Sequence, residues 1–361
     1  MPGTKHGGDI YSIAREYGFS PEEVIDFSGN ISPLGTPDSL KRAIIDNIDI
    51  LSQYPDPEYV DLREAISGYT GVAAKNIIVG NGGTELISLF FKVLNPKAGL
   101  VLMPTYSEYE REIKINGGRY EYYRLKEEDD FAPDVDDIMN CIHGHDILVM
   151  CNPNNPTGAA VVAGEMERIL DKAAKEGCFV FVDETYAEFA DDAKHISCAG
   201  LVDRYDNLFV IRGISKFFAT PGLRIGYGLT SNTSVIGDIL AIKDPWTISS
   251  IAEAAGQAVF KDIEYQNSTK KWMREEKEFI LNKIKEIKNI KVYGSDSNFF
   301  LCKILSSHTS SALREFMLSY AIDIRDAANF HYLNDKFFRF CVLKREDNER
   351  LIRLLGEFFN G

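Results

Sequence analysis

Residues 211–227 of this chain read IRGISKFFATPGLRIGY, and the fold is organised around them. The apolar run Asn207–Ile211 leads into this stretch and predicts a buried strand. Lys216 follows that strand and is flanked by Phe217 and Phe218. Burial disfavours the ammonium form of a lysine, and the neutral amine is the form that a Schiff-base lysine needs. The stretch therefore predicts a reactive lysine at the end of a strand.

Two further residues of the same stretch suit a phosphate group. Ser215 would supply a hydroxyl, and Arg224 would supply a fixed cation. Taken alone, the pattern is explained equally well by a lysine–arginine pair on the surface beside a serine turn. The choice between the two interpretations depends on the rest of the chain.

The composition is that of a soluble globular protein. Apolar residues make up 45% and charged residues 26% of the 361 positions, enough for one large core or two smaller ones. The formal net charge of −14 argues against nucleic acid and anionic membranes as partners. No apolar run approaches the ~18 residues of a membrane span. An acidic protein of this kind must bind a phosphorylated ligand through a few well-placed cations.

The cysteines and the first residues bear on the cellular compartment. Six cysteines are scattered without a C-x-x-C pair, which predicts free thiols in a reducing compartment and no disulfide or zinc framework. The N-terminus lacks the apolar segment of a signal peptide, so we expect a cytoplasmic location. His143 and His145 are expected to be exposed to solvent, and no metal site is predicted.

Short apolar runs alternate with helical patterns between residues 77 and 227. The predicted strands cover residues 77–79, 99–103, 146–151, 178–182 and 207–211. This alternation predicts an α/β fold with a doubly wound, mostly parallel sheet. Ligands of such sheets bind at the carboxyl ends of the strands. Residues suited to a ligand follow these ends: Gly83, Thr84, Tyr106, Asn155, Asp183, Tyr186 and Lys216.

The last third of the chain predicts a smaller α+β domain. Strands are expected at 291–293, 299–304 and 337–342, and helices at 310–320 and 346–359. We expect an N-terminal arm with part of the small domain at 1–44, a large domain at 45–245 and the small domain at 246–361. Arg325 and Arg339 lie in apolar surroundings, where an arginine has either an anionic ligand or a buried acidic partner.

The motifs taken together resemble a known family over essentially the whole chain. NPNNPTG (152–158), VDETY (182–186) and SKFFATPGLRIGY (215–227) are similar to those of fold type I pyridoxal-phosphate enzymes of the aspartate aminotransferase superfamily. Within it the chain resembles histidinol-phosphate aminotransferases and, more closely, threonine-phosphate decarboxylases of cobalamin synthesis. The segments that carry the closer resemblance are HGG (6–8), DFSGNISPLG (26–35), GNGGTEL (80–86), PTYSEYE (104–110) and IRDAANF (324–330).

The resemblance implies a role for each matching residue. Lys216 would form the Schiff base with pyridoxal 5′-phosphate and then move protons. Asp183 would pair with the ring nitrogen, and Tyr186 and Asn155 would bond the ring oxygen. Tyr106 would stack on the ring. The cofactor phosphate would be held by Gly83, Thr84, Ser215 and Arg224, with Tyr54 from a neighbouring subunit of a homodimer.

The resemblance also implies a small phosphorylated amino acid as substrate. Arg339 would fork onto its α-carboxylate. The candidates for the rest of the substrate are His6, Gly8, Asn30, Asn155 and Arg325. From the residues alone, however, His6 and Gly8 are read more plainly as a frayed N-terminal arm.

The reaction implied is decarboxylation of O-phospho-L-threonine, and also of O-phospho-L-serine, to an amino alcohol phosphate for a corrin side chain. The alternative is an aminotransferase acting on histidinol phosphate or a related amino acid with 2-oxoglutarate. The chain departs from many decarboxylases after the Arg339 strand, where it has Lys344-Arg345. A non-catalytic relative and a nicotinamide oxidoreductase are weaker alternatives, because Lys216, Asp183 and Asn155 are intact and no G-x-G-x-x-G turn is present.

Overall fold

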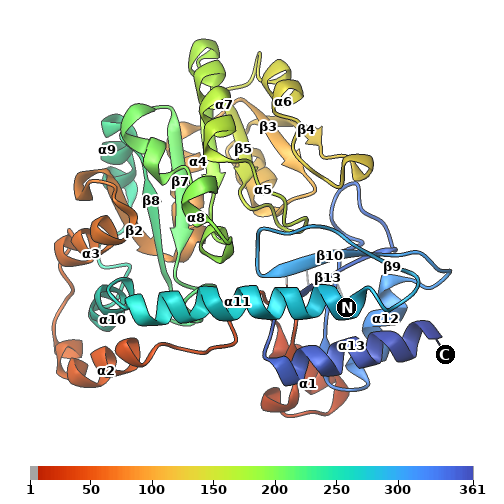
Figure 1. The fold of residues 1–361 in the computed structure, drawn as a ribbon. Coiled ribbons are helices and arrows are strands. Elements are labelled where there is room, and N and C mark those ends of the chain that lie inside the picture. The colour runs from red at the N-terminus through yellow and green to blue at the C-terminus, as the bar shows by residue number, and fades with distance from the viewer. Residues whose placement is uncertain (1–6, 361) are drawn as a thin grey trace.

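A seven-stranded sheet forms the centre of the larger part of the molecule (Figure 1). The computed structural model describes residues 7–360. The strand order is β2-β8-β7-β6-β5-β3-β4, and every neighbouring pair is parallel except the two pairs that β8 makes. The strands are β2 Ile77–Asn81, β3 Ala98–Met103, β4 Arg119–Arg124, β5 Ile147–Cys151, β6 Phe179–Asp183, β7 Leu208–Gly213 and β8 Ile225–Leu229. The predicted α/β fold with a mostly parallel sheet is confirmed.

Helices cover both faces of this sheet, because its inner strands are apolar on both sides. Every residue of β3, β5 and β6 is buried, as expected for a parallel sheet enclosed by two layers. One face packs on α4, α5 and α9, and the other on α3, α6, α7 and α10. These helices are α3 Val60–Thr70, α4 Gly82–Leu94, α5 Glu108–Ile115, α6 Val135–Cys141, α7 Ala163–Glu176, α9 Thr233–Ile242 and α10 Ser250–Phe260.

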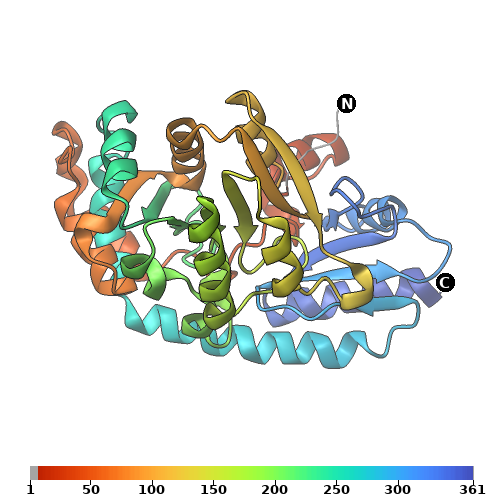
Figure 2. The ribbon, with the colours of Figure 1, turned by 90° about the horizontal axis from the view of Figure 1, so that it is seen from above.

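A four-stranded antiparallel sheet with the order β12-β13-β10-β9 forms the centre of the smaller part. Its strands are β9 Ile290–Val292, β10 Phe299–Ile304, β12 Arg325–Asp326 and β13 Phe337–Cys341. The long helix α11 (Ile263–Ile284) runs along one side of the molecule from the large sheet to the small one (Figure 2). The remaining helices are α1 Ile10–Tyr17, α2 Asp38–Asp46, α8 Ala193–Ile196, α12 Ser310–Leu318 and α13 Arg345–Asn360.

The N-terminal segment joins the smaller part through a short sheet of its own. Strand β1 (Ile25–Asp26) pairs in parallel with β11 (Ile322–Asp323). Further along, α2 packs against α10, which also contacts α3. The domain boundaries expected at residues 44 and 245 stay a prediction. Among the described helices, none combines the length and the apolar character that a bilayer crossing demands.

Two strands of the large sheet, β4 and β8, have no clear signal in the sequence and were not predicted. Strand β4 reads RYEYYR and lies at the sheet edge, where charged side chains face solvent and no apolar run marks the strand. Strand β8 reads IGYGL, and its two glycines weaken a strand signal. The strands that were predicted match the observed ones to within two residues at each end, and the strand predicted at 299–304 has the same bounds as β10. The direction of β8 against its neighbours is what makes the sheet mixed.

Candidate active site

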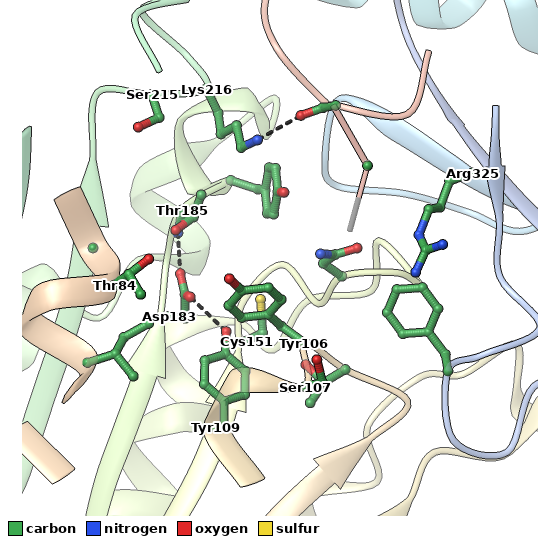
Figure 3. A pocket seen from close by; sticks show the side chains of 18 of the residues that line it. Thr84, Tyr106, Ser107, Tyr109, Cys151, Asp183, Thr185, Ser215, Lys216 and Arg325 are labelled. Atoms are coloured by element: carbon green, nitrogen blue, oxygen red, sulfur yellow. Dashed lines mark hydrogen bonds between the residues drawn. The ribbon is translucent and has the colours of Figure 1, made fainter. Parts of the chain in front are cut away.

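A cavity of about 620 Å³ lies where the carboxyl ends of the large-sheet strands meet the smaller sheet. Its size is typical of a site for a small molecule. Figure 3 shows Thr84, Asp183, Tyr106 and Lys216 around one side of this space and Arg325 on the other. Both parts of the molecule therefore contribute to its wall.

Most of the residues predicted for the site line this cavity. They are Gly83, Thr84, Tyr106, Asn155, Asp183, Tyr186, Ser215, Lys216, Arg224, Arg325 and Arg339. Asn30 and Gly8 do not line it, but each contacts a residue that does. Tyr54 lies outside it: its side chain is 80% exposed, and its ring centroid is 4.6 Å from that of Trp246. His6 lies outside the described residues.

Lys216 lies in the loop between β7 and β8, with its amine in the cavity. Its Nζ donates a hydrogen bond to the carbonyl oxygen of Gly29 at 2.7 Å (Figure 3). Burial, with the neighbouring Arg339 guanidinium as the next cause, lowers the pKa of Lys216 from 10.5 to about 8. A lysine with this pKa is available in both protonation states near neutral pH, as an acid–base group requires.

Asp183 is the last residue of β6 and is almost completely buried. Its Oδ2 accepts a hydrogen bond from the hydroxyl of Tyr109 at 2.7 Å, and its Oδ1 accepts one from the amide of Thr185 at 2.9 Å (Figure 3). Burial raises the pKa of Asp183, and these hydrogen bonds oppose the rise. No lysine, arginine or histidine within residues 7–360 forms an ion pair with it. A buried carboxylate of this kind suits a cationic group of a ligand.

The first turn of α4 forms a cradle of backbone amides. Gly82 has φ +75°, and a Cβ atom built on it would come within 2.2 Å of the Arg224 guanidinium. The helix begins without a side-chain cap, so the amides of Gly83 and Thr84 face the cavity together with the hydroxyl of Ser215. A helix N-terminus with an adjacent arginine is suited to a phosphate. The glycine turn thus lies at the start of a helix beside the cavity, and its role in holding a phosphate stays a prediction.

Arg339 is buried in the middle of β13 and points at the strand ends of the large sheet. One of its Nη atoms donates to Asn155 Oδ1, and the other donates to the carbonyl oxygen of Ser28 at 2.6 Å. Its Nε has no hydrogen-bond partner among the described residues. Burial lowers the pKa of Arg339. A buried guanidinium held at both ends by neutral oxygens retains its charge for an anionic ligand.

Arg325 supplies a second cation from the smaller part. It pairs with Arg339 in the register of β12 and β13, and its Nη2 donates to Asn329 Oδ1 at 2.8 Å. Burial, followed by the charge of Arg339, lowers the pKa of Arg325 to about 10. Two guanidinium groups on adjacent strands repel each other, and anions bound between them relieve that repulsion.

Two tyrosines complete the wall on the large-sheet side. Burial raises the pKa of Tyr106 to about 12 and raises that of Tyr186 further. The hydroxyl of Tyr186 accepts a hydrogen bond from Asn30 Nδ2 at 3.3 Å, and Asn30 Oδ1 has no partner among the described residues. Both tyrosines therefore remain neutral hydrogen-bonding groups at physiological pH.

Several residues that line the cavity were not among those predicted from the sequence. Tyr109 follows Tyr106 by three residues, so one turn of backbone brings both rings to the same edge, and this spacing was the available signal. Ser28 and Gly29 line the cavity through a turn far away in sequence. The mouth is lined by Glu110 and by residues of the loop after β12: Asn329, Phe330 and His331.

The expectation that His143 and His145 are both exposed was half wrong. The side chain of His143 is 84% exposed, and its Nδ1 lies 2.8 Å from Glu176 Oε2, so it does have a carboxylate partner. The side chain of His145 is only 10% exposed, and its Nε2 lies 3.8 Å from Glu121 Oε2 of the edge strand β4. Neither histidine lines the cavity.

Comparison with known proteins follows this geometry. The family model for aminotransferase class I and II matches residues 22–355. A protein of Caldanaerobacter subterraneus subsp. tengcongensis, provisionally named a threonine-phosphate decarboxylase, is 41% identical and aligns over 98% of this chain and 94% of its own length. The threonine-phosphate decarboxylase of Salmonella typhimurium is 31% identical over 99% of this chain and 97% of its own.

A solved structure adds a different activity to the comparison. The histidinol-phosphate aminotransferase of Clostridium acetobutylicum superimposes with a TM-score of 0.88 at 33% identity, covering 93% of this chain and 99% of that one. The chain is thus similar at comparable levels to proteins of both named activities.

Proposed function

The chain belongs to the class I and II aminotransferase family, and from that premise we propose that it decarboxylates O-phospho-L-threonine to aminopropanol phosphate for cobalamin biosynthesis. Enzymes of this family use pyridoxal 5′-phosphate. The observation that carries the proposal is a pair of arginines on adjacent strands of the small sheet, the buried Arg339 and the partly buried Arg325, which both line the cavity. O-phospho-L-threonine has two anionic groups, a carboxylate and a phosphate, and each matches one guanidinium. The relatives named as threonine-phosphate decarboxylases support the same substrate.

The cavity fits pyridoxal 5′-phosphate at two ends. The uncapped amides of Gly83 and Thr84, with Arg224, form a cradle for its phosphate. The buried carboxylate of Asp183 has no cationic partner among residues 7–360 and would pair with the protonated ring nitrogen. When bound, the cofactor supplies a ring that withdraws electrons from the bond that breaks at the substrate α-carbon.

The remaining roles follow from the positions of the side chains. Tyr106 would lie against the ring face, and Asn155 and Tyr186 would hold the ring oxygen. Lys216 Nζ would deliver the proton that replaces the departing carboxylate at the α-carbon. Its pKa of about 8 suits this step, because an ordinary lysine holds its proton too tightly at neutral pH.

For the substrate, Arg339 would bind the α-carboxylate, and Arg325 with Asn30 would help to hold the phosphate end. Gly8 is proposed as a substrate-binding residue because its amide donates a hydrogen bond to the hydroxyl of Ser28, which lines the cavity. O-phospho-L-serine is a second substrate to test, since one methyl group changes discrimination by only about 1–3 kcal/mol. We keep the cytoplasmic location as a prediction from the free cysteines.

We also propose that the protein works as a homodimer with shared sites. Tyr54, Ile45 and Leu51 are strongly exposed, and so to a lesser degree is Trp246. Large apolar side chains exposed near one another mark an interaction surface. A second copy that covers them would bring its Tyr54 toward the phosphate cradle of the first.

The test is to supply the cofactor-loaded protein with O-phospho-L-threonine and no 2-oxoacid, and to measure CO₂. We expect release over many turnovers and none with the Lys216→Ala protein. Because decarboxylation consumes no amino acceptor, added 2-oxoglutarate should leave the rate unchanged. Absence of CO₂ with the loaded wild-type protein would overturn the proposal.

The second candidate is an aminotransferase on histidinol phosphate with 2-oxoglutarate. The structural similarity to the Clostridium acetobutylicum protein favours it. The arginine pair fits it as well, since 2-oxoglutarate carries two carboxylates. Formation of glutamate from 2-oxoglutarate and histidinol phosphate, without CO₂, would establish this function instead.

A further inference from the structure

The segment Asp26–Asn30 passes between the two parts of the molecule and lies against the cavity. At its start, Asp26 Oδ1 accepts three hydrogen bonds: from the amide of Ser28 at 2.7 Å, the hydroxyl of Ser28 at 2.6 Å and the amide of Gly29 at 3.1 Å. The Ser28 hydroxyl in turn accepts a bond from the amide of Gly8 at 2.9 Å. One carboxylate therefore orders the whole turn.

The turn holds both functional cations through its backbone. The carbonyl oxygen of Gly29 accepts the Nζ hydrogen bond of Lys216, and the carbonyl oxygen of Ser28 accepts the Nη2 hydrogen bond of Arg339. Because a peptide carbonyl carries only a partial charge, these two bonds do not neutralise either cation. A negative charge nearby stabilises buried cations that are held in this way.

Asp26 supplies that charge. Its carboxylate raises the pKa values of both Lys216 and Arg339, opposing burial, which is the largest influence on each. The charged or titratable groups that act on Lys216 are Arg339, Asp26, Cys341 and Arg224. The two arginines lower its pKa, and Cys341 is a buried neutral thiol, so Asp26 is the carboxyl group in that set.

We propose that Asp26 is a positioning residue that serves both cations: it orders the turn whose carbonyls bind Lys216 and Arg339, and it supplies their shared negative charge. The proposal rests on the cofactor-binding role of Lys216 but not on which reaction follows. The competing account is that Asp26 only caps a turn. The two accounts differ in whether the charge of Asp26, apart from its shape, matters to Lys216.

Two variants separate charge from shape. Asp26→Asn keeps an oxygen that can accept hydrogen bonds from the turn but removes the charge. The matched control is Asp146→Asn, because Asp146 Oδ2 likewise accepts hydrogen bonds from two backbone amides, those of Lys97 at 2.6 Å and Ala98 at 2.9 Å. Asp146 precedes β5 and does not line the cavity. Asp26→Glu, which retains the charge, is the conservative variant.

The measurement is the rate at which the cofactor-free protein captures pyridoxal 5′-phosphate, followed by absorbance from pH 6 to pH 10. Peptide mapping after borohydride reduction confirms that Lys216 is the residue modified. Capture requires the neutral amine, so the midpoint of the profile reports on Lys216. Loss of a negative charge lowers the pKa of a nearby lysine. We expect the Asp26→Asn midpoint to move to lower pH by about half a unit or more.

The control should keep the wild-type midpoint, and Asp26→Glu should stay closer to wild type than Asp26→Asn. Circular dichroism verifies that each variant is folded. If Asp26→Asn does not fold, the midpoint of Asp26→Glu is compared with that of wild type instead. Equal midpoints for Asp26→Asn and wild type, or an Asp26→Glu shift as large as expected for Asp26→Asn, would overturn the proposal. Since the assay reads cofactor capture, its outcome does not depend on whether CO₂ is released.

Discussion

Lys216 illustrates how a single side chain takes its chemistry from burial. The amine lies in a cavity beside Arg339 and Arg224. Among the described residues, its one hydrogen bond is to the carbonyl oxygen of Gly29. The folded protein therefore favours the neutral amine, whereas an unfolded chain holds the lysine proton up to its ordinary pKa of 10.5. The same shift that prepares the residue for reaction makes the empty protein less stable at neutral pH.

We predict that Lys216→Met stabilises the cofactor-free protein at pH 7 by about 1–3 kcal/mol, a range reduced because the amine lines an open cavity. Below pH 8 Lys216 is protonated in both the folded and the unfolded protein, so burial of the charged amine lowers the free energy of unfolding of the wild type. Between pH 8 and 10.5 the unfolded chain binds more protons, so wild-type stability rises relative to the variant. Above pH 10.5 the advantage of the variant vanishes.

Urea unfolding at a series of pH values measures this difference. Lys271→Met is the control, because the side chain of Lys271 is 80% exposed and its removal should not produce the same pH dependence. A Lys216→Met protein that is less stable than wild type at pH 7 would contradict the interpretation.

At the scale of elements, the site depends on how closely β8 approaches the start of α4. Strand β8 pairs with β2, the strand that leads into α4, and a Cβ atom at Gly226 would lie 2.5 Å from the backbone of Gly82 and Gly83. The loop before β8 brings Arg224 beside the same turn with φ +61°. A left-handed arginine is a strained arrangement that is typical of functional sites. The cradle is thus made by one helix and one strand in direct backbone contact.

We therefore predict that Gly226→Ala destabilises the protein by about 2 kcal/mol, because overpacking forces β8 away from α4. The affinity for pyridoxal 5′-phosphate should fall at least about ten-fold, since the amide cradle and Arg224 move apart. Thermal unfolding and a cofactor titration check the two effects. Gly222→Ala is the control, because a Cβ atom there meets nothing within 4 Å. Equal cofactor affinities for the two variants would show that the contact is unimportant.

At the scale of the whole molecule, the cavity is bounded by three parts of the chain that are far apart in sequence. The large sheet provides Lys216 and Asp183, the small sheet provides Arg325 and Arg339, and the N-terminal turn closes the space between them. Tyr54 is the one predicted cofactor contact that a single chain leaves outside. Because Tyr54 is exposed next to Trp246, we infer that a second copy of the chain covers it in a homodimer.

A complementation experiment tests that arrangement. Lys216→Ala and Tyr54→Ala are each expected to be strongly impaired, the second because each site would lose a contact to the cofactor phosphate. After unfolding and refolding of an equal mixture, random pairing gives one intact site in half of the dimers, so about a quarter of the sites should be active. Refolding each variant alone is the control. No gain on mixing, with dimers present by analytical ultracentrifugation, would rule out a shared site.

The sequence by itself determined the alternation of strands and helices and the local order of the functional residues. Strands β2, β6 and β7 begin as apolar runs, and a polar or glycine-rich turn follows each of them, so Gly83, Asp183 and Lys216 had to meet at one end of the sheet. The pattern is readable because burial on both faces of a parallel strand leaves no choice of residue type. The motifs around these residues were also enough to identify the family.

Only the tertiary structure decided which distant groups touch one another. Three hydrogen bonds of the site join residues separated by 74 to 311 positions. They run from Tyr109 to Asp183, from Lys216 to the carbonyl of Gly29, and from Arg339 to the carbonyl of Ser28. No local pattern encodes such contacts, since they follow from how helices and domains pack. The edge strand β4 was hidden because its charged side chains face solvent, and the reversed strand β8 was hidden because two glycines interrupt its apolar residues.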